Sequence, residues 1–179
     1  MHHDAILSKL SSVLKDTDEK FTERVISTID SAEKIFITGA GRSGLVARFF
    51  VMRLMHCGYQ VYLVGETVTP SLKKDDLLIV VSGSGSTESL LPLARKAKAL
   101  GAPVALITMK SESAIGNVAD IVLPMGNLNS SSFDAPSSMP MGTVFELSTL
   151  VFLESVIADV VKLKGIKEDY MRELHANLE

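Results

Sequence analysis

Short apolar runs alternate with helical stretches along most of the chain. Five such runs, at residues 34–38, 59–64, 77–81, 103–108 and 120–123, predict buried β-strands. Residues 45–57 and 87–100 lie between strands and are predicted to be helices that end at Gly58 and Gly101. Strands alternating with helices in this way form parallel βαβ units. The pattern predicts an α/β fold: a five-stranded, doubly wound parallel sheet with helices on both faces, a three-layer arrangement of the flavodoxin-like or Rossmann-like kind.

Further helices are predicted on either side of this alternating core. Residues 4–14 and 18–29 carry apolar side chains at helical spacing. Residues 142–164 form a helix that is apolar on nearly every side, and residues 167–178 a short polar one. Because one small sheet cannot cover a helix that is apolar all round, we expect a subunit interface on it.

An irregular segment precedes the long apolar helix. Residues 124–140 contain three prolines and a run of three serines. A structureless loop of this length inside a compact domain is usually functional, and we expect it to cover the site and exclude water. A short helix is predicted at residues 114–118, just before the fifth strand.

Composition and charge exclude several classes of protein but point to no particular functional residue. A chain of 179 residues can bury a full core as one domain, and a net charge of −3 provides no basic field for nucleic acid. The sequence contains no apolar run long enough for a membrane span and no signal peptide. The single cysteine, Cys57, excludes an internal disulfide and fits a reducing cytoplasm. We therefore expect a cytoplasmic protein with no nucleic-acid or membrane partner.

The loop after the third strand is the most informative stretch. It consists of Ser82, Gly83, Ser84, Gly85, Ser86 and Thr87. A loop between a strand and a helix N-terminus offers backbone N–H groups to an anion, and its hydroxyls add further donors. No lysine follows in the pattern of a nucleotide P-loop. The loop predicts a cradle for a small monophosphate such as a sugar phosphate; the alternative is a turn that only caps a helix.

A glycine-rich loop also follows the first strand. Residues 39–44 fit the G-x-G-x-x-G pattern, and Glu66 lies 22 residues beyond Gly44, close to the dinucleotide fingerprint. An NAD site would not need the second donor-rich loop, and Gly65 separates Glu66 from its strand. The same glycines let the backbone approach a sugar phosphate, with Ser43 adding a hydroxyl and Arg42 a charge. The alternative for Arg42 is an ordinary solvated charge.

Glu146 is the conspicuous polar residue in the first turn of the apolar helix. A carboxylate partly buried among apolar side chains suits a general base that works near neutrality. The alternative is a favourable charge at a helix N-terminus. The histidines form no H-x-x-x-H or H-E-x-x-H pattern, so neither a metal nor a cofactor is predicted.

Taken together, these motifs resemble a known family. Residues 39–44, 82–87 and 141–146 are similar to the sugar isomerase (SIS) domain, and residues 53–56, 64–70 and 174–179 resemble its 6-phospho-3-hexuloisomerase branch. The similarity runs from the first strand to the last residue. It implies a single SIS domain over residues 1–179, with N-terminal helices at 4–30 and C-terminal helices at 142–178.

The resemblance also implies roles for individual residues. The second loop would hold the phosphate through Ser82, Ser84 and Thr87, with Ser43 after the first strand adding to it. Ser86 stands where family members commonly carry glutamate, which leaves the hydroxyl pattern intact. Glu146 corresponds to the proposed base. His175 is the candidate for a second catalytic histidine, from its own subunit or a neighbouring one. The family is oligomeric, which implies a homotetramer built as a dimer of dimers.

The implied reaction converts D-arabino-3-hexulose 6-phosphate to D-fructose 6-phosphate through an enediol. It belongs to the ribulose monophosphate pathway of formaldehyde fixation, next to 3-hexulose-6-phosphate synthase. One alternative is another SIS isomerase, such as one that acts on arabinose 5-phosphate. Another is a sugar-phosphate sensor without catalytic activity. Sensors of this fold usually carry a DNA-binding domain, and the 30 residues before the first strand are too few and too acidic for one.

Overall fold

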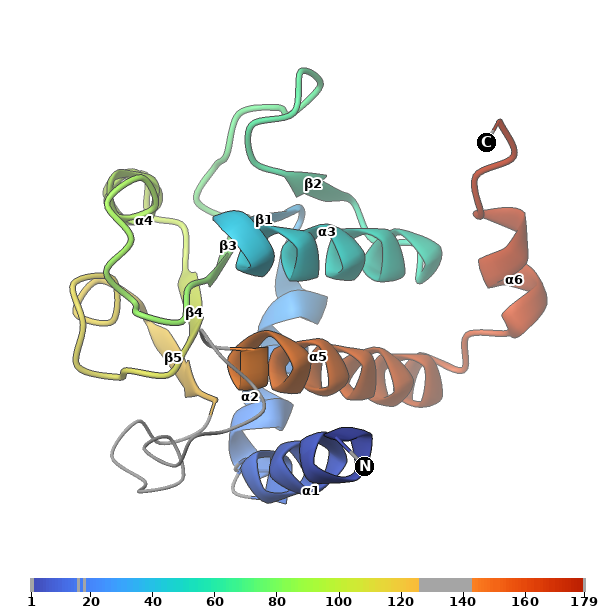
Figure 1. The fold of residues 1–179 in the computed structure, drawn as a ribbon. Helices are drawn as coiled ribbons and strands as arrows, with labels where there is room; N and C mark the ends of the chain where they lie inside the picture. The colour runs from blue at the N-terminus through green and yellow to red at the C-terminus, as the bar shows by residue number, and fades with distance from the viewer. Residues whose placement is uncertain (1, 16, 18, 126–142, 179) are drawn as a thin grey trace.

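A single parallel sheet forms the centre of the molecule in the computed structural model, which describes residues 2–15, 17, 19–125 and 143–178. Its strands are β1 (Ile35–Gly39), β2 (Val61–Leu63), β3 (Leu77–Val81), β4 (Val104–Thr108) and β5 (Ile121–Pro124). They lie in the order β2-β1-β3-β4-β5, and every pairing is parallel (Figure 1). The five-stranded doubly wound sheet expected from the apolar runs is therefore confirmed.

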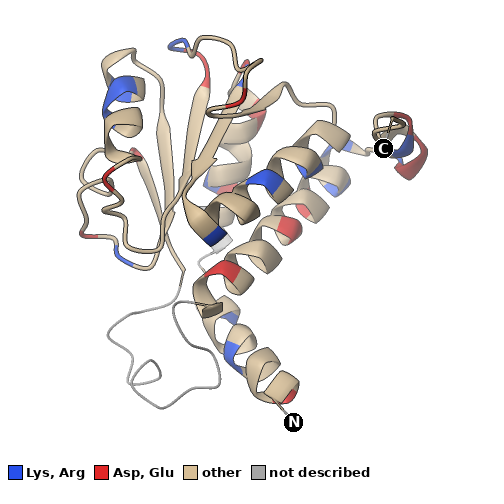
Figure 2. Cartoon of the chain, turned by 45° about the horizontal axis from the view of Figure 1, so that its top comes forward, with Lys and Arg blue, Asp and Glu red and all other residues tan. Residues whose placement is uncertain are grey.

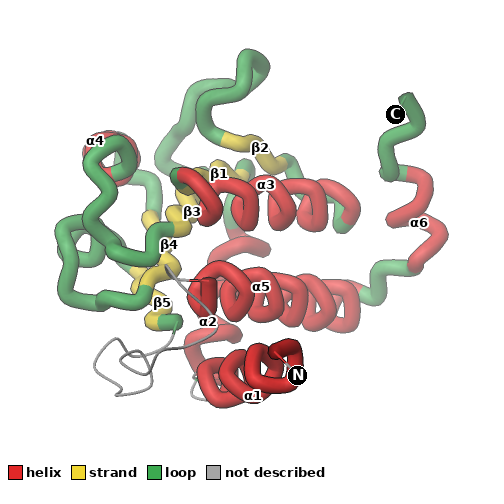
Figure 3. Tube along the Cα trace, viewed as in Figure 1, coloured by secondary structure: helices red, strands yellow, loops and turns green. Residues whose placement is uncertain are grey.

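Helices cover both faces of this sheet (Figures 1 and 3). They are α1 (His2–Lys15), α2 (Glu19–Ser31), α3 (Gly41–His56), α4 (Leu91–Ala99), α5 (Thr143–Lys164) and α6 (Glu168–Glu173). Within the described ranges, no helix combines the length and apolarity that crossing a membrane would require.

Alternation along the strands divides the core into two layers. In β1, Ile35 and Ile37 point into a cluster with α2, α3 and α5, whereas Phe36 points into a second cluster with α4. All five residues of β3 are buried, because helices pack on both of its faces. The carboxyl ends of β1, β3 and β4 are left at one edge, where the loops that follow them emerge.

The long apolar helix α5 is covered largely by its own chain. Phe152 and Leu153 are buried in the core cluster that packs on the sheet. Helix α1 packs on a different face of α5, where Leu10 of α1 and Val144 of α5 share a small cluster. Val151 and Leu163 stay 46% and 72% exposed. From the sequence, only the sheet was considered as cover for this helix, and a subunit interface was expected on it; α1 covers part of the remaining surface by packing onto it.

Three helix boundaries differ from the sequence-based prediction. Helix α3 begins at Gly41 rather than at residue 45, and α4 begins at Leu91 rather than at residue 87. Pro92 stands at the start of α4, where its missing N–H costs no helical hydrogen bond, and this fixes the later start. The final helix covers only Glu168–Glu173 of the predicted 167–178.

Two other loop predictions have different outcomes. Residues 114–118 form successive turns rather than a helix. Their backbone bonds run from Val118 and Ala119 back to Ile115 and form no continuous helical ladder. The predicted loop at 124–140 lies, apart from its first two residues, outside the described residues.

Candidate active site

The two glycine-rich segments begin at neighbouring positions of the sheet. Gly39, the last residue of β1, pairs with Val81, the last residue of β3. Strand β2 lies on one side of β1 and β3 on the other, so the chain reverses its direction of winding between β1 and β3. Ligands of open α/β sheets bind at the carboxyl ends of the strands at such a switch point. The fold therefore places both segments where a ligand is expected.

The first segment is part of a helix rather than a free turn. Ala40 is the N-cap of α3, with no side-chain cap, and Arg42 and Ser43 lie in its first turn. A Cβ atom at Gly39 would lie 2.8 Å from the carbonyl oxygen of Ser43, and one at Gly44 would lie 2.8 Å from that of Gly39. These two glycines allow α3 to start directly against β1. As a result, the N–H groups of the first helical turn, which have no acceptor within the helix itself, lie at the edge of the sheet.

The second segment is a compact loop that retains unused donors. The Gly85 N–H donates to the carbonyl of Ser82 at 3.0 Å, and the hydroxyls of Ser82 and Thr87 are 2.9 Å apart. The Ser86 N–H donates to Ser84 Oγ at 3.2 Å. Within the described part of the chain, the N–H groups of Gly83, Ser84 and Thr87 donate to no protein acceptor. Three amides and several hydroxyls in six residues form a donor set suited to a phosphate.

Gly85 is essential to the shape of this loop. Its φ is +61°, and a Cβ atom there would lie 2.1 Å from Ser113 Oγ. Its carbonyl accepts from the Ile115 N–H at 2.8 Å. The turns at 111–119 thus hold the loop from behind, with the Ala114 N–H also donating to Ser86 Oγ at 3.4 Å.

Two supporting residues were missed in the sequence. Thr108 Oγ1 donates to the Gly83 carbonyl at 3.2 Å, and Ser113 Oγ accepts from the Gly116 N–H at 3.1 Å. Thr108 ends β4, next to β3, so its place at the carboxyl end of a neighbouring strand was the available signal. Ser113 lies in irregular backbone, and nothing in the sequence indicated its role.

The first turn of α5, which carries Glu146, lies beside both segments. The ring of its neighbour Phe145 comes within 3.2 Å of the position that a Cβ atom at Gly83 would occupy. The Glu146 side chain is 17% exposed, and its Oε1 lies 3.3 Å from Arg42 Nε and 3.3 Å from Arg42 Nη2. Its Oε2 is buried without a hydrogen-bond partner among the described residues. One oxygen is therefore held by Arg42, while the other can accept a proton.

Arg42 connects α3 to α5 through its ion pair with Glu146, and a second ion pair joins the same two helices. Arg53 Nη2 also binds Glu154 Oε1, at 2.7 Å, further along the same two helices. In Figure 2 the basic positions of α3 lie alongside the acidic positions of α5. The structure thus brings Arg42, which is half exposed, to the predicted base, at the edge of the sheet where the loop at 82–87 also begins.

His175 lies at the opposite end of α3. Its ring stacks on that of His56, with centroids 5.1 Å apart, whereas Glu146 contacts Arg42 at the start of the helix. A helix of 16 residues is about 24 Å long. Within one chain, His175 therefore lies well away from Glu146. This separation does not fit one of the two origins left open for the histidine, a role at the site of its own chain.

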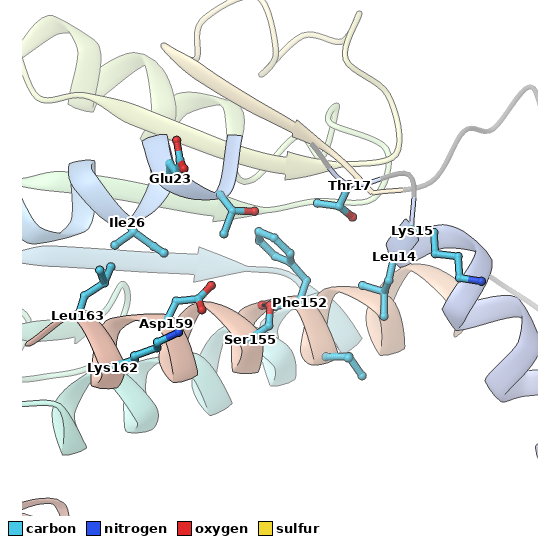
Figure 4. A pocket seen from close by; sticks show the side chains of 12 residues that line it. Leu14, Lys15, Thr17, Glu23, Ile26, Phe152, Ser155, Asp159, Lys162 and Leu163 are labelled. Atoms are coloured by element: carbon cyan, nitrogen blue, oxygen red, sulfur yellow. Dashed lines mark hydrogen bonds between the residues drawn. The ribbon is translucent and has the colours of Figure 1, made fainter. Parts of the chain in front are cut away.

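Two further features lie apart from this site. Glu66, the residue that a dinucleotide would require for its ribose, instead pairs with Arg48 at 2.7 Å. A groove of about 690 Å³ lies between α2 and α5, with Glu23 and Asp159 among its charged lining residues (Figure 4). Two lysines, Lys15 and Lys162, also line this groove, so its charges balance and it offers no net positive charge to a phosphate dianion. In the described ranges, no three His, Cys, Asp or Glu side chains gather closely enough to hold a metal ion.

Fold and site together define a class of protein. The SIS domain model matches residues 28–143, which is more than half of the chain, and the chain belongs to the SIS domain family.

Named relatives extend this similarity to nearly the full length. The chain is 52% identical to the 3-hexulose-6-phosphate isomerase of Methylomonas aminofaciens, covering 99% of this chain and 98% of the relative. It is 40% identical to the enzyme of that name from Bacillus subtilis, covering 97% and 95%. A crystal structure from Methanococcus jannaschii, from which a 3-hexulose-6-phosphate isomerase function was inferred, superposes with a TM-score of 0.88 at 40% identity and 100% coverage of both chains.

Proposed function

We propose that this protein is an isomerase that converts D-arabino-3-hexulose 6-phosphate to D-fructose 6-phosphate. The observation that carries the proposal is the buried Oε2 of Glu146, which has no hydrogen-bond partner among the described residues, near a lysine-free, donor-rich loop at the switch point of the sheet. Full-length similarity to relatives named 3-hexulose-6-phosphate isomerase supports the choice of sugar.

The reaction moves a carbonyl from C3 to C2. Glu146 takes the proton from C2, the electron pair forms the C2–C3 double bond, and the C3 carbonyl oxygen takes up a proton to give an enediol. The O2 hydroxyl then loses its proton as the C2 carbonyl forms, and Glu146 returns a proton to C3. One carboxylate on one face of the substrate can perform both transfers. The loop at 82–87 binds the phosphate far from the reacting carbons and so orients the chain. Arg42 is placed to stabilise the negative charge that develops on O2 and O3.

The substrate's own chemistry limits what a histidine has to do. With the carbonyl at C3 and the phosphate on O6, no five- or six-membered ring can close. The forward reaction therefore needs no ring opening. His175 of a neighbouring subunit would instead move the proton between O2 and O3, and would open the ring of fructose 6-phosphate in the reverse direction.

An exposed stripe on α3 supports such an assembly. Leu45, Phe49 and Met52 follow one another along one face of the helix and are 66%, 39% and 49% exposed. The arginines of α3 lie on either side of this stripe. Each is paired with a carboxylate of its own chain, in the pairs Arg42–Glu146, Arg48–Glu66 and Arg53–Glu154. Because these charges are already compensated, two copies of α3 can approach without strong repulsion.

A two-fold axis at Phe49 would complete the site. Phe49 lies midway between Arg42 and His56 in the sequence. Two antiparallel copies of α3 that cross at this residue place the His56 end of each helix against the Arg42 end of the other. Since His175 stacks on His56, this arrangement brings His175 of the partner subunit to Glu146. A dimer of this kind is the building block of the proposed tetramer.

Replacing Phe49 with aspartate should break this assembly. The new charge would have to be buried in an apolar contact, which is costly, so light scattering should report a smaller species. Activity should fall together with the oligomer, because His175 would no longer reach its site. Val68→Asp is the matched control: Val68 is 82% exposed in the loop after β2, and its variant should keep the native mass and activity. An unchanged mass for Phe49→Asp would contradict this interface.

Replacing Ser84 with alanine should raise KM for the phosphorylated sugar and leave kcat nearly unchanged. Ser84 contributes a hydroxyl and a backbone N–H to the loop, and the variant loses only the hydroxyl. A lost hydrogen bond to a charged group costs about 1.5–3 kcal/mol, or a rise of roughly ten- to a hundredfold in KM. Ser89→Ala, an exposed serine just beyond the loop, is the control. Equal KM values for the two variants would remove Ser84 from phosphate binding.

The direct test is to supply 3-hexulose 6-phosphate to the purified protein and follow the appearance of fructose 6-phosphate. We expect turnover without added metal or cofactor. Arabinose 5-phosphate serves as the competing substrate. Turnover of that sugar alone would assign the protein to a different SIS isomerase.

A further inference from the structure

The C-terminal segment is attached to the end of α3 by two ring contacts. The imidazoles of His56 and His175 are stacked, with centroids 5.1 Å apart and planes inclined by 15°. Tyr170 Oη lies 2.7 Å from where a Cβ atom at Gly58 would be, so a larger residue there would displace the Tyr170 hydroxyl. Gly58 also has φ +85°, which favours glycine for a second reason. The segment that carries His175 is thus seated on the last turn of α3.

We propose that His56 is a positioning residue for His175: its buried ring is the platform that holds the His175 ring at a fixed height and tilt beyond the end of α3. This inference rests on the proposed function, in which His175 serves the site of a neighbouring subunit. His56 would act only through His175 and would not touch the substrate.

Burial and charge make His56 suitable as a platform. Its residue is only 6% exposed, whereas His175 is exposed. Burial, followed by the neighbouring His175 and Arg53, lowers the pKa of His56. Each of these influences opposes the imidazolium form and so favours the neutral ring of His56. A neutral ring can stack on His175 in either protonation state, whereas two imidazolium rings would repel one another.

The surroundings of His56 reinforce this state. Arg53, one turn earlier on α3, is held by Glu154 of α5. The adjacent Cys57 thiol has its pKa raised, mainly by burial, and so adds no negative charge. No carboxylate among the groups that shift the His56 pKa favours its protonation.

A hydrogen bond next to the stack determines the tautomer of His175. His175 Nδ1 lies 2.9 Å from the carbonyl oxygen of Ala176. A carbonyl only accepts, so this contact places a proton on Nδ1, and in the neutral ring the lone pair is then on Nε2. The His175 backbone N–H donates to the Arg172 carbonyl at 3.1 Å and fixes the ring's attachment point. Stack and hydrogen bond together define which nitrogen can take a proton from a sugar hydroxyl.

Two replacements of His56 distinguish the stacking of a flat ring from the ability of that ring to bind a proton. His56→Ala removes the platform, while His56→Phe keeps a flat ring that cannot be charged. The chain has four histidines, so carbon-13 labelling at the imidazole Cε1 gives four signals, and His175→Ala identifies one of them. His3→Ala, at an exposed position on α1, is the control for the loss of a histidine. Each variant is measured as the full-length protein for kcat, KM, mass in solution and the imidazole signals.

We expect His56→Ala to shift the His175 signals and to lower kcat about tenfold or more, since a misplacement of about 1 Å can cost up to ~10²-fold. KM for the phosphosugar should stay within about twofold, because phosphate binding takes place elsewhere. His56→Phe should recover most of kcat and His3→Ala should behave as the wild type. A kcat for His56→Ala equal to the wild type, or unmoved His175 signals, would overturn the inference.

Failure of the proposed function can be told apart from failure of this inference. Should His175→Ala retain full kcat, His175 would be removed from the proposed mechanism, and a signal shift in His56→Ala would then report a structural contact alone. Should His175→Ala be inactive and His56→Ala fully active, the mechanism would stand and the platform would be rejected.

Discussion

Replacing Glu146 with glutamine should lower kcat by at least ~10²-fold, the usual effect of losing a general base. Glutamine has nearly the same shape and can still accept a hydrogen bond from Arg42, so α5 and its link to α3 should remain in place. Its amide cannot take the C2 proton. KM should change much less than kcat, because the phosphate is held by the loop at 82–87 rather than by this side chain. Steady-state kinetics with 3-hexulose 6-phosphate would measure both parameters.

Asp159→Asn is the matched control for this experiment. Asp159 is another carboxylate of α5, but it is exposed and lines the groove beside α2. Its variant should keep normal turnover, and circular dichroism should show that both proteins are folded. Near-normal kcat in Glu146→Gln would discard Glu146 as the base and return Arg42 and His175 as the groups to examine.

Replacing Gly85 with alanine should lower kcat/KM by at least about tenfold and also destabilise the fold. An L-residue in the left-handed conformation costs about 1–2 kcal/mol, and here the new methyl group would also collide with Ser113 Oγ. Relief of this collision requires the loop to move away from the turns at 111–119. The donors of the loop would then leave their positions, and catalysis depends strongly on such geometry.

Gly165→Ala separates the cost of the backbone from the cost of the collision. Gly165 has the same φ of +61°, but a Cβ atom there would have no neighbour within 4 Å. It follows α5, far along the chain from the phosphate loop. This variant should lose about 1–2 kcal/mol of unfolding free energy from the backbone alone and keep its kcat/KM. Equal activity losses in the two variants would show that Gly85 has no specific role in the loop.

The strands could be predicted from the sequence because of how they are buried. In β3, residues 77–81 are all apolar and all buried, so this short apolar run alone predicted the strand. Strand β2 was predicted at six residues and has three, because it lies at the edge of the sheet and is only half-buried. A parallel sheet also fixes which strand ends share an edge. That is why residues far apart, at 39–44 and 82–87, could be assigned to one site.

The other errors concern contacts that leave no local signal. The glycines at 39 and 44 were interpreted as a turn, yet their function is to let α3 start against β1, and helix packing is not visible in spacing alone. The contact of Arg42 with Glu146 joins residues 104 positions apart. Each charge was noticed, but nothing in the sequence indicated that they would meet. The stack of His56 on His175 was missed for the same reason.

Helix α3 carries a different half of the proposed chemistry at each end, with the Arg42 contact to the base at its start and the histidine stack at its finish. Because a helix is rigid, a change in its number of residues changes the position of one end relative to the other. A single inserted or deleted residue within it would turn its two ends by about 100° relative to each other. The number of residues in α3 is therefore as much a functional constraint as their identity, and related chains that keep this chemistry should tolerate substitutions in the helix far more readily than insertions.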